Sequence, residues 1–228
     1  MGQDVNRADD NGATVTLPTN SGIAPPADYR LLLPEGWFRV NIDPEQREAS
    51  VSALVNRQFE GTDNAPHIKR QLREELLAQA TAAFNAGGLE LYLSLQQAGP
   101  LTIPASLLIT LLPPTSGGKA LTAESIAARL SADSDVAVSV VELSAGTAVR
   151  TRRMMGQPDR SAPPGVPGTP DEALPSVTLD YQLPVPATGA HLLLTFSTPL
   201  VQIADAMVEL FDAVAASLRW TEGGSAHE

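Results

Sequence analysis

The C-terminal stretch from His191 to Trp220 constrains the fold more than any other part of the sequence. It begins with a short apolar run, His191 to Phe196, which has the length of a strand. Thr198 and Pro199 then suit the cap and the first position of a helix. That helix carries apolar residues at spacings of three and four (Leu200, Ile203, Met207, Phe211, Val214 and Leu218) and polar residues opposite (Gln202, Asp205, Glu209 and Asp212). A helix with one apolar face, directly after an apolar strand, predicts a sheet on which the helix packs.

Strand patterns recur through the rest of the chain. Apolar residues alternate with polar ones, or form short continuous apolar runs, at 29–33, 38–42, 89–95, 105–112, 136–143, 147–155 and 176–183. Most of these segments follow one another through short turns, as antiparallel neighbours do. The sequence therefore predicts an α+β fold: a central, mostly antiparallel sheet flanked by helices in an α/β/α sandwich.

Three helices are expected before the C-terminal one. Asp43 with Pro44 and Gln46 is typical of a helix start, and the helical hairpin that begins there ends at Gly87-Gly88. A third, short helix is capped by Thr122. The second helix of the hairpin is expected to bury Ile68, Leu72, Leu76, Ala80, Ala83 and Phe84.

The two ends and one internal segment lack these patterns. Residues 1–27 are polar and predict a flexible arm, and residues 221–228 predict a disordered tail. Residues 156–175 contain six prolines and three glycines, which predicts a loop that is either functional or disordered. The organisation that follows is a single α+β domain at 28–220.

Charge and cysteine content exclude several classes of function. A formal net charge of −11, with only 15 Lys and Arg residues, argues against a nucleic-acid partner, because that affinity depends on clustered cations. The absence of cysteine excludes disulfides, thiolate zinc sites and cysteine nucleophiles. The first 27 residues contain no apolar core of a secretory signal, and no apolar run is long enough to span a bilayer. We therefore expect a cytoplasmic protein without a membrane span.

Motifs for catalysis, metal binding or cofactor binding do not emerge from the sequence. His67 and His191 have no His or carboxylate at a spacing that would place a second metal ligand beside them. No Gly-x-Ser-x-Gly occurs, and Gly117-Gly118-Lys119 lacks the first glycine and the Ser or Thr of a phosphate loop. The expectation is a protein that is not an enzyme and that needs no cofactor.

One basic cluster is a candidate binding site. Arg150, Arg152 and Arg153 place three of the 15 positive charges within four residues. On a strand, Arg150 and Arg152 share one face and Arg153 points to the other. Arginine suits bidentate pairing with carboxylates and interface anchoring, so these residues are predicted to contact a protein partner. The alternative is that an exposed strand carries the charges to discourage edge pairing.

Two short motifs resemble the PsbP-like, or Mog-type, fold group. These are the corner Pro34-Glu35-Gly36-Trp37 after the first strand, and the closing stretch Leu192 to Pro199 followed by a helix through Phe211 and Leu218. The group includes the photosystem extrinsic protein, a Ran-binding nuclear import factor and actinobacterial lipoproteins, and the Ala-, Leu- and Pro-rich composition fits a high-GC actinobacterium. The resemblance covers 28–220 and implies an antiparallel sheet flanked by helices, in proteins that bind other proteins without catalysis. No functional residue of the group carries over, and the lipidation cysteine of its lipoproteins is absent.

Two hypotheses for function follow. The first is a non-catalytic interaction protein, an adaptor or chaperone-like component of a bacterial complex, that binds its partner through Arg150–Arg153 or through the hairpin at 43–88. The second is a small-molecule-binding or regulatory module with a pocket between sheet and helices and Trp37 or Tyr92 in its wall. The identity of the partner and the oligomeric state cannot be read from the sequence.

Overall fold

The computed structural model describes residues 26, 28–59, 66–98, 101–114, 121–132, 136–155 and 175–221. Four segments discussed in the sequence analysis lie outside these residues, except for the end residues Pro26, Pro175 and Thr221, which are described. They are the arm at 1–27, Gly117-Gly118-Lys119, the Pro-rich loop at 156–175 and the tail at 221–228.

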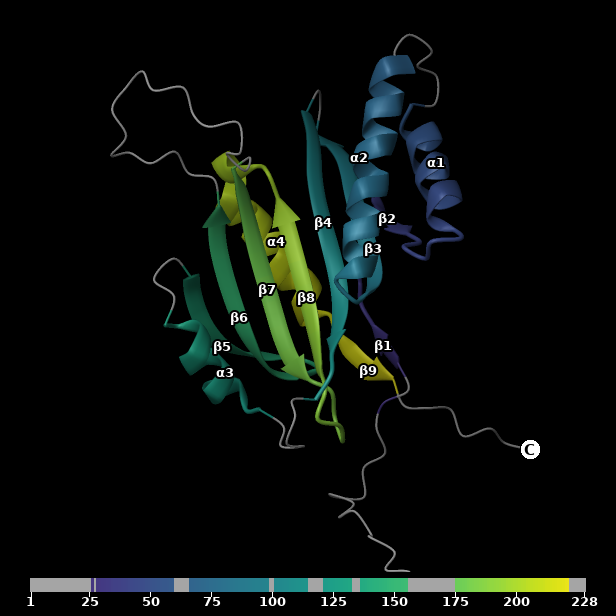
Figure 1. The fold of residues 1–228 in the computed structure, drawn as a ribbon. Coiled ribbons are helices and arrows are strands. Elements are labelled where there is room, and N and C mark those ends of the chain that lie inside the picture. Colours follow the sequence, from purple (N-terminus) through teal and green to yellow (C-terminus); the bar gives the residue numbers. More distant parts are fainter. Residues whose placement is uncertain are drawn as a thin grey trace, which may run out of the picture.

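Seven strands form the central sheet, which confirms the predicted antiparallel architecture (Figure 1). They are β2 (Trp37–Val40), β3 (Gly88–Ala98), β4 (Leu101–Leu112), β5 (Val136–Leu143), β6 (Gly146–Met155), β7 (Ser176–Pro184) and β8 (His191–Thr198). Their order is β2-β3-β4-β8-β7-β6-β5, and every neighbouring pair is antiparallel. The last strand pattern of the sequence, β8, therefore pairs with both β4 and β7 and joins the two halves of the sheet.

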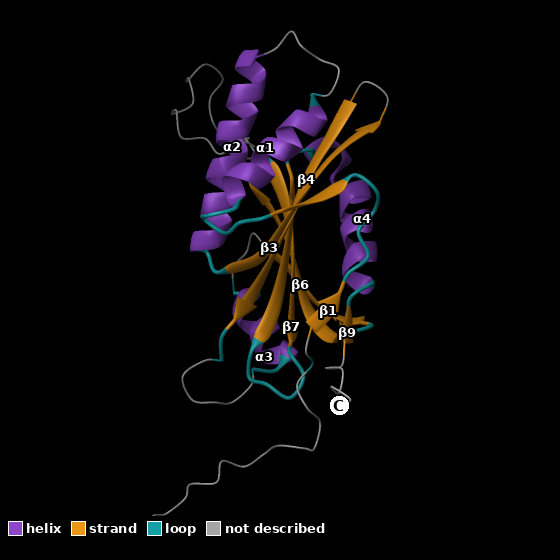
Figure 2. Cartoon of the chain, turned by 90° about the vertical axis from the view of Figure 1, so that its right-hand side faces the viewer, coloured by secondary structure: helices purple, strands orange, loops and turns teal. Residues whose placement is uncertain are grey.

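Helices cover both faces of the sheet, as predicted (Figure 2). Helix α4 (Ala204–Ala216) lies on one side, and α1 (Arg47–Gln58) and α2 (Pro66–Asn85) lie on the other. The short helix α3 (Ala123–Leu130) contacts β5 and β6 and lies on the α2 side of the sheet (Figure 1). None of these helices is both long and apolar enough to cross a membrane, within the residues that the structure describes. We call the two surfaces of the sheet the α4 face and the α2–α3 face.

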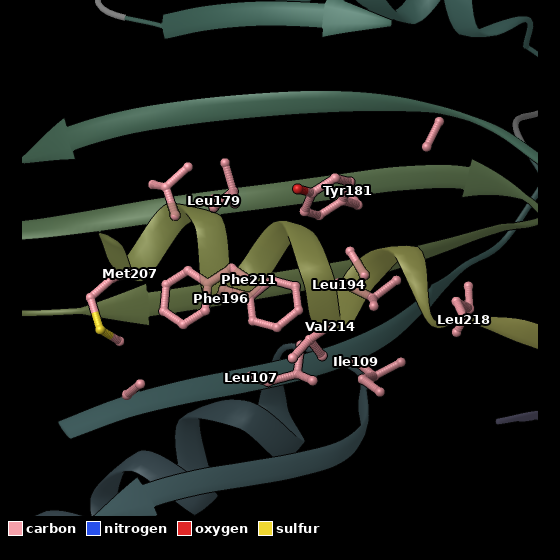
Figure 3. Packing of buried hydrophobic residues seen from close by; sticks show 14 of the residues in the cluster. Leu107, Ile109, Leu179, Tyr181, Leu194, Phe196, Met207, Phe211, Val214 and Leu218 are labelled. Carbon is pink, nitrogen blue, oxygen red and sulfur yellow. The ribbon is translucent and has the colours of Figure 1, made fainter. Parts of the chain in front are cut away.

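The main core lies between the α4 face and α4 itself (Figure 3). Phe211 of α4 stacks on Phe196 of β8, with ring centroids 4.9 Å apart and planes 19° apart. Tyr181 of β7 meets Phe196 edge-on, with centroids 6.1 Å apart. All three side chains are essentially inaccessible to solvent. Aromatic residues make up only 4% of the chain, and three of them gather at this one point of contact between helix and sheet.

The C-terminal helix begins later than Pro199, the position expected from the sequence. The Thr198 hydroxyl accepts a hydrogen bond from the Leu200 amide, but a 3-10 turn, Val201–Ile203, precedes α4. Because a 3-10 turn has three residues per turn, it shifts the phase of the apolar stripe, and Ile203 is 43% exposed where it was expected to be buried. Leu218 is fully buried, although it follows the helix.

A second core lies between the helical hairpin and the α2–α3 face at β2 and β3. Leu76, Ala80 and Ala83 are buried as expected, whereas Ile68 and Phe84 are exposed, so the buried stripe of α2 is narrower than predicted. Helix α1 begins at Arg47 and not at Pro44. The Asp43 carboxylate accepts a hydrogen bond from the Glu45 amide, and a turn at residues 44–46 precedes the helix.

The ends of the described chain pair in a small sheet of their own. Strand β1 (Asp28–Arg30) is antiparallel to β9 (Arg219–Thr221), with Tyr29 opposite Trp220. The predicted strand at 29–33 is therefore shorter than expected and lies outside the main sheet, and Trp220 is in a strand where a helix was expected. The Trp220 indole donates a hydrogen bond to the Ala145 carbonyl at the turn between β5 and β6, 2.8 Å away. This bond anchors the small sheet to the large one.

Candidate functional site

The three predicted arginines lie on β6, the second strand from one edge of the sheet. Cross-strand pairing puts Arg150 opposite Tyr181 and Arg152 opposite Leu179, both of which face α4. Arg153 is opposite Thr178 and lies on the α2–α3 face. The alternation predicted from the sequence is confirmed. Since β6 has neighbours on both sides, the idea that its charges protect an exposed edge is wrong.

Arg150 makes a two-point ion pair with Asp212 of α4. Its Nε lies 2.8 Å from Oδ1 and its Nη2 lies 3.1 Å from Oδ2. The Tyr181 hydroxyl also donates to Asp212, and Arg150 Nε lies 3.3 Å from the same hydroxyl. The hydrogen bond to Asp212 raises the pKa of Arg150, while burial and the bond to Asp212 raise the pKa of the Tyr181 hydroxyl. Arg150 therefore keeps its charge and Tyr181 keeps its proton across the physiological range.

Arg152 pairs with Asp205, about two helical turns before Asp212 in α4. Arg152 Nη2 lies 2.8 Å from Asp205 Oδ1, but the Asp205 side chain is 88% exposed. Such a pair is weak because water competes for both groups. Across the strand pair, Arg152 is opposite Ala137, and the Arg152 side chain is 27% exposed. Arg152 is the arginine of the three that is best placed to change partners.

Arg153 points to the α2–α3 face, where Thr151, Asp180 and Thr195 form a row of polar residues across three strands. Asp180 of β7 is opposite Thr151 on one side and Thr195 on the other. Burial raises the pKa of Asp180, and the hydroxyl groups of Thr195 and Thr151 and the charge of Arg153 oppose this shift. Arg153 Nε is buried without a hydrogen-bond partner among the described residues. Arg153 therefore cannot share one binding surface with Arg150 and Arg152.

The edge next to these arginines is formed by β5. This strand has eight residues, of which four are valine and one, Glu142, is charged, and it contains neither Lys nor Pro. Val140 is 43% exposed. No described strand pairs with its outer side. Natural sheets usually protect such an edge with charges, proline or a short strand, and β5 has none of these features beyond Glu142.

The opposite edge of the same sheet, β2, is protected against pairing with another strand. Strand β2 has only four residues and includes Arg39, which pairs with Glu90 at 2.8 Å. The guanidinium of Arg57 in α1 lies over the Phe38 ring, 4.6 Å from its centroid. A short, charged edge that a helix partly covers is a poor template for another strand. Among the strands that the structure describes, β5 is thus the less protected edge of the sheet.

The hairpin turn determines which backbone groups of β5 point outward. Leu143 and Gly146 are paired across a two-residue turn, and a pair in this position is hydrogen-bonded. Bonded and non-bonded pairs alternate along an antiparallel ladder. The residues of β5 that turn their N–H and C=O groups away from β6 are therefore Val136, Val138, Val140 and Glu142.

A hollow lies beside this edge on the α4 face. Helix α4 packs mainly on β7 and β8, and a cavity of about 340 Å³ remains between it and β5. Val141, Leu143 and Ala216 give the cavity an apolar wall, and Arg150 and Asp212 give it a charged one. The edge and the cavity together form the candidate functional site.

Two further cavities lie between helices and the α2–α3 face. One of about 310 Å³ lies under α3, and one of about 230 Å³ lies beside α2. Neither Trp37 nor Tyr92 lines these cavities or the one beside β5. The Tyr92 hydroxyl, like that of Tyr29, donates to Glu90, at 3.3 and 2.5 Å respectively. Tyr92 thus belongs to an internal cluster that attaches β1 to β3, and neither residue lines any of these three cavities.

Neither histidine is part of a metal-binding group. His67 is exposed at the start of α2. His191 is 5% exposed, and its Nε2 lies 3.2 Å from the Leu121 carbonyl. Within the described ranges, no three His, Asp or Glu side chains come together in a way that would hold a metal ion.

Comparisons with known proteins found a distant structural likeness. The chain matches neither a known protein family nor a curated protein. Among solved structures it is similar to Mog1p, the Ran-binding protein of Saccharomyces cerevisiae, with 13% identity and a TM-score of 0.38. The match covers 58% of this chain and 79% of the yeast protein. A likeness of this size carries no argument about function, and the actinobacterial origin suggested by composition stays a prediction.

Sequence reasoning found the arginines but not what they contact. Asp212 was placed on the solvent side of its helix, whereas it is half-buried against Arg150. A signal was present: Asp205 and Asp212 are seven residues apart and so share one helix face, as Arg150 and Arg152 share one strand face. Two acidic residues on one helix face and two basic residues on one strand face can form two ion pairs when that helix packs on that strand.

Proposed function

We propose that this chain is a non-catalytic protein-interaction module, an adaptor or chaperone-like component of a bacterial complex in the cytoplasm. It binds an extended segment of its partner, which adds as a further strand to β5. The unpaired eight-residue edge of β5 is the observation that carries this proposal. In strand addition the backbone hydrogen bonds supply affinity, and pockets for alternate side chains supply specificity.

The neighbourhood of β5 defines the chemistry of the segment. Side chains of an added strand alternate between the two faces of the sheet, so every second one points towards the cavity beside α4. Val141 and Leu143 favour an apolar side chain there. Further along the edge, Arg152 favours a carboxylate, which replaces the exposed Asp205 as its partner. The partner segment is thus extended, with apolar residues at alternate positions and an acidic residue near one end.

The arginines have different roles in this proposal. Arg152 contacts the partner directly. Arg150 holds α4 in place through Asp212 and so shapes the wall of the cavity. Arg153 lies on the opposite face and contributes through Asp180 only to the sheet.

The test compares variants at the edge with a control elsewhere. Val138→Pro removes an outward N–H group and leaves the bonded pairs with β6 intact. Val140→Lys introduces the charge that protected edges carry. The control is Ile68→Lys on α2, which also replaces an exposed apolar residue, 47% exposed against 43% for Val140. Each tagged protein is purified from its own cells, and stoichiometric partners are identified by mass spectrometry.

We expect both edge variants to lose a partner that the wild type and Ile68→Lys retain, with all four proteins folded by circular dichroism. Amide exchange on the purified complex supplies a second measurement, because the outward amides of Val136, Val138, Val140 and Glu142 gain protection from an added strand. A folded Val138→Pro protein that keeps its partner contradicts strand addition. Protection confined to residues 47–85 places the interface on the helical hairpin instead.

A further inference from the structure

The cavity under α3 is independent of the β5 edge and has the composition of a ligand site. Its volume is about 310 Å³, and apolar walls come from Leu112 of β4, Leu121, and Ile126 and Leu130 of α3. Ligand pockets have volumes of about 300–1,000 Å³ and are mostly apolar with a few polar groups that orient the ligand. This cavity is therefore large enough for a small molecule, and its walls combine apolar and polar side chains as those of ligand pockets do.

Three polar side chains converge on the cavity: Arg129, Gln182 and His191. Arg129 is the charged group among them, and none of the lining residues that the structure describes is acidic. This is notable in a chain whose net charge is −11, because an anion is repelled by most of the surface but attracted here. Arg129 is exposed and makes no ion pair with any described acidic residue.

His191 adds a second polar contact with a defined orientation. Its ring is 5% exposed, and Nε2 lies 3.2 Å from the Leu121 carbonyl. Because a carbonyl oxygen can only accept, Nε2 carries the proton in this bond. The bond holds the ring against Leu121, the residue that precedes the N-cap of α3, in the wall of the cavity.

We propose that the cavity under α3 binds a small monocarboxylate with an apolar body. The carboxylate pairs with Arg129, which presents a planar fork of donors suited to two carboxylate oxygens. The hydrocarbon body lies against Leu112, Ile126 and Leu130. A volume near the lower limit for ligand pockets restricts the body to about six to ten carbons. The site is separate from the strand-addition surface, since none of its residues belongs to β5.

The proposal is tested by titrating the full-length protein with octanoate and with octanol, which has the same body without the charge. Binding is followed by NMR shifts of the Ile126 methyl groups and by calorimetry. Arg129→Gln removes the charge, and Arg70→Gln, at an exposed position on α2, is the matched control. Leu130→Trp fills the cavity from a half-buried position.

We expect octanoate to shift Ile126, with an affinity that Arg129→Gln lowers about tenfold or more and that Arg70→Gln leaves unchanged. Octanol should bind more weakly and be indifferent to Arg129→Gln, and Leu130→Trp should abolish both. Absence of any octanoate-dependent shift at Ile126, or equal binding by the wild type and Arg129→Gln, overturns the proposal. Val138→Pro at the β5 edge should not alter octanoate binding, so this result stands or fails separately from strand addition.

Discussion

Arg150 and Asp212 join strand β6 to helix α4 through two N–H···O contacts of 2.8 and 3.1 Å. The Tyr181 hydroxyl donates to the same carboxylate, so three elements of the fold meet at one acidic side chain. The apolar core determines that α4 lies on this face, and the pair determines its rotation and position along the sheet. This geometry leads to the first of four predictions.

The Arg150–Asp212 pair should contribute measurably to stability, and the Arg152–Asp205 pair should not. In the first pair Arg150 is 20% exposed and Asp212 is 42% exposed, whereas in the second pair Asp205 is 88% exposed. Double-mutant cycles with alanine, followed by urea unfolding, should give a coupling of about 1–2 kcal/mol for the first pair. The second pair should give less than about 0.5 kcal/mol. Equal couplings would show that burial does not distinguish the two pairs.

Replacing Phe211 by alanine should destabilise the fold by about 3–5 kcal/mol, because the change opens a cavity opposite Phe196. Phe211 is completely buried and stacks on Phe196. Ile203→Ala is the control, because Ile203 belongs to the same predicted apolar stripe but is 43% exposed. This substitution should change the free energy of unfolding by less than about 0.5 kcal/mol. Thermal unfolding of both variants checks the prediction, and similar losses would mean that Ile203 is buried in solution.

Asp180 should make stability depend on pH in the direction opposite to that of most carboxylates. Its folded-state pKa is raised, chiefly by burial, so the protonated form is favoured in the fold. The stability that this proton contributes is present below the ordinary pKa of about 3.9 and is lost as the pH rises through the folded-state value. Asparagine cannot ionise. The melting temperature of Asp180→Asn should therefore rise relative to the wild type between pH 4 and pH 7.

Calorimetric melting at several pH values in this range measures that difference. Asp205→Asn, at an exposed position on α4, is the control and should show little change. If the melting temperature of Asp180→Asn instead falls relative to the wild type as the pH rises, the hydroxyl groups and Arg153 dominate over burial.

Gly36 should tolerate alanine less well than Gly87, although both have positive φ. At Gly36, φ is +87° and an added Cβ would lie 2.6 Å from Cγ of Gln96. At Gly87, φ is +77° and no atom lies within 4 Å of the added Cβ. The left-handed conformation alone costs about 1–2 kcal/mol for alanine. We expect Gly87→Ala to lose that amount and Gly36→Ala to lose more, as measured by urea unfolding.

Much of the fold could be predicted because its elements have strong local patterns. The alternation at 176–183 and the apolar run at 191–196 correspond to β7 and β8, and the short helix capped by Thr122 begins at Ala123. Local patterns could not show that β8 pairs with β4, about 90 residues earlier in the chain. They also could not show that Arg219–Thr221 leaves the helical pattern to pair with Asp28–Arg30, because that choice depends on a distant partner.

The candidate site could be predicted only in part, for a related reason. The sequence alone shows three arginines within four residues, and the alternation of side chains along a strand assigns each arginine to one face of the sheet. Whether an arginine is paired depends on where α4 lies, which is a property of the whole fold. The accessibility of β5 depends on strand order, since the valine-rich pattern of an edge strand is the same as that of a central one.

The pairing of β1 with β9 has a mechanical consequence. Asp28 lies opposite Thr221 and Arg30 lies opposite Arg219, so the two ends of the described chain leave the molecule side by side. A force that pulls these ends apart acts on one hydrogen bond at a time, from Asp28 inward, and does not shear the pair along its length. The small sheet should open at low force, while the seven-stranded sheet and α4 remain folded behind it.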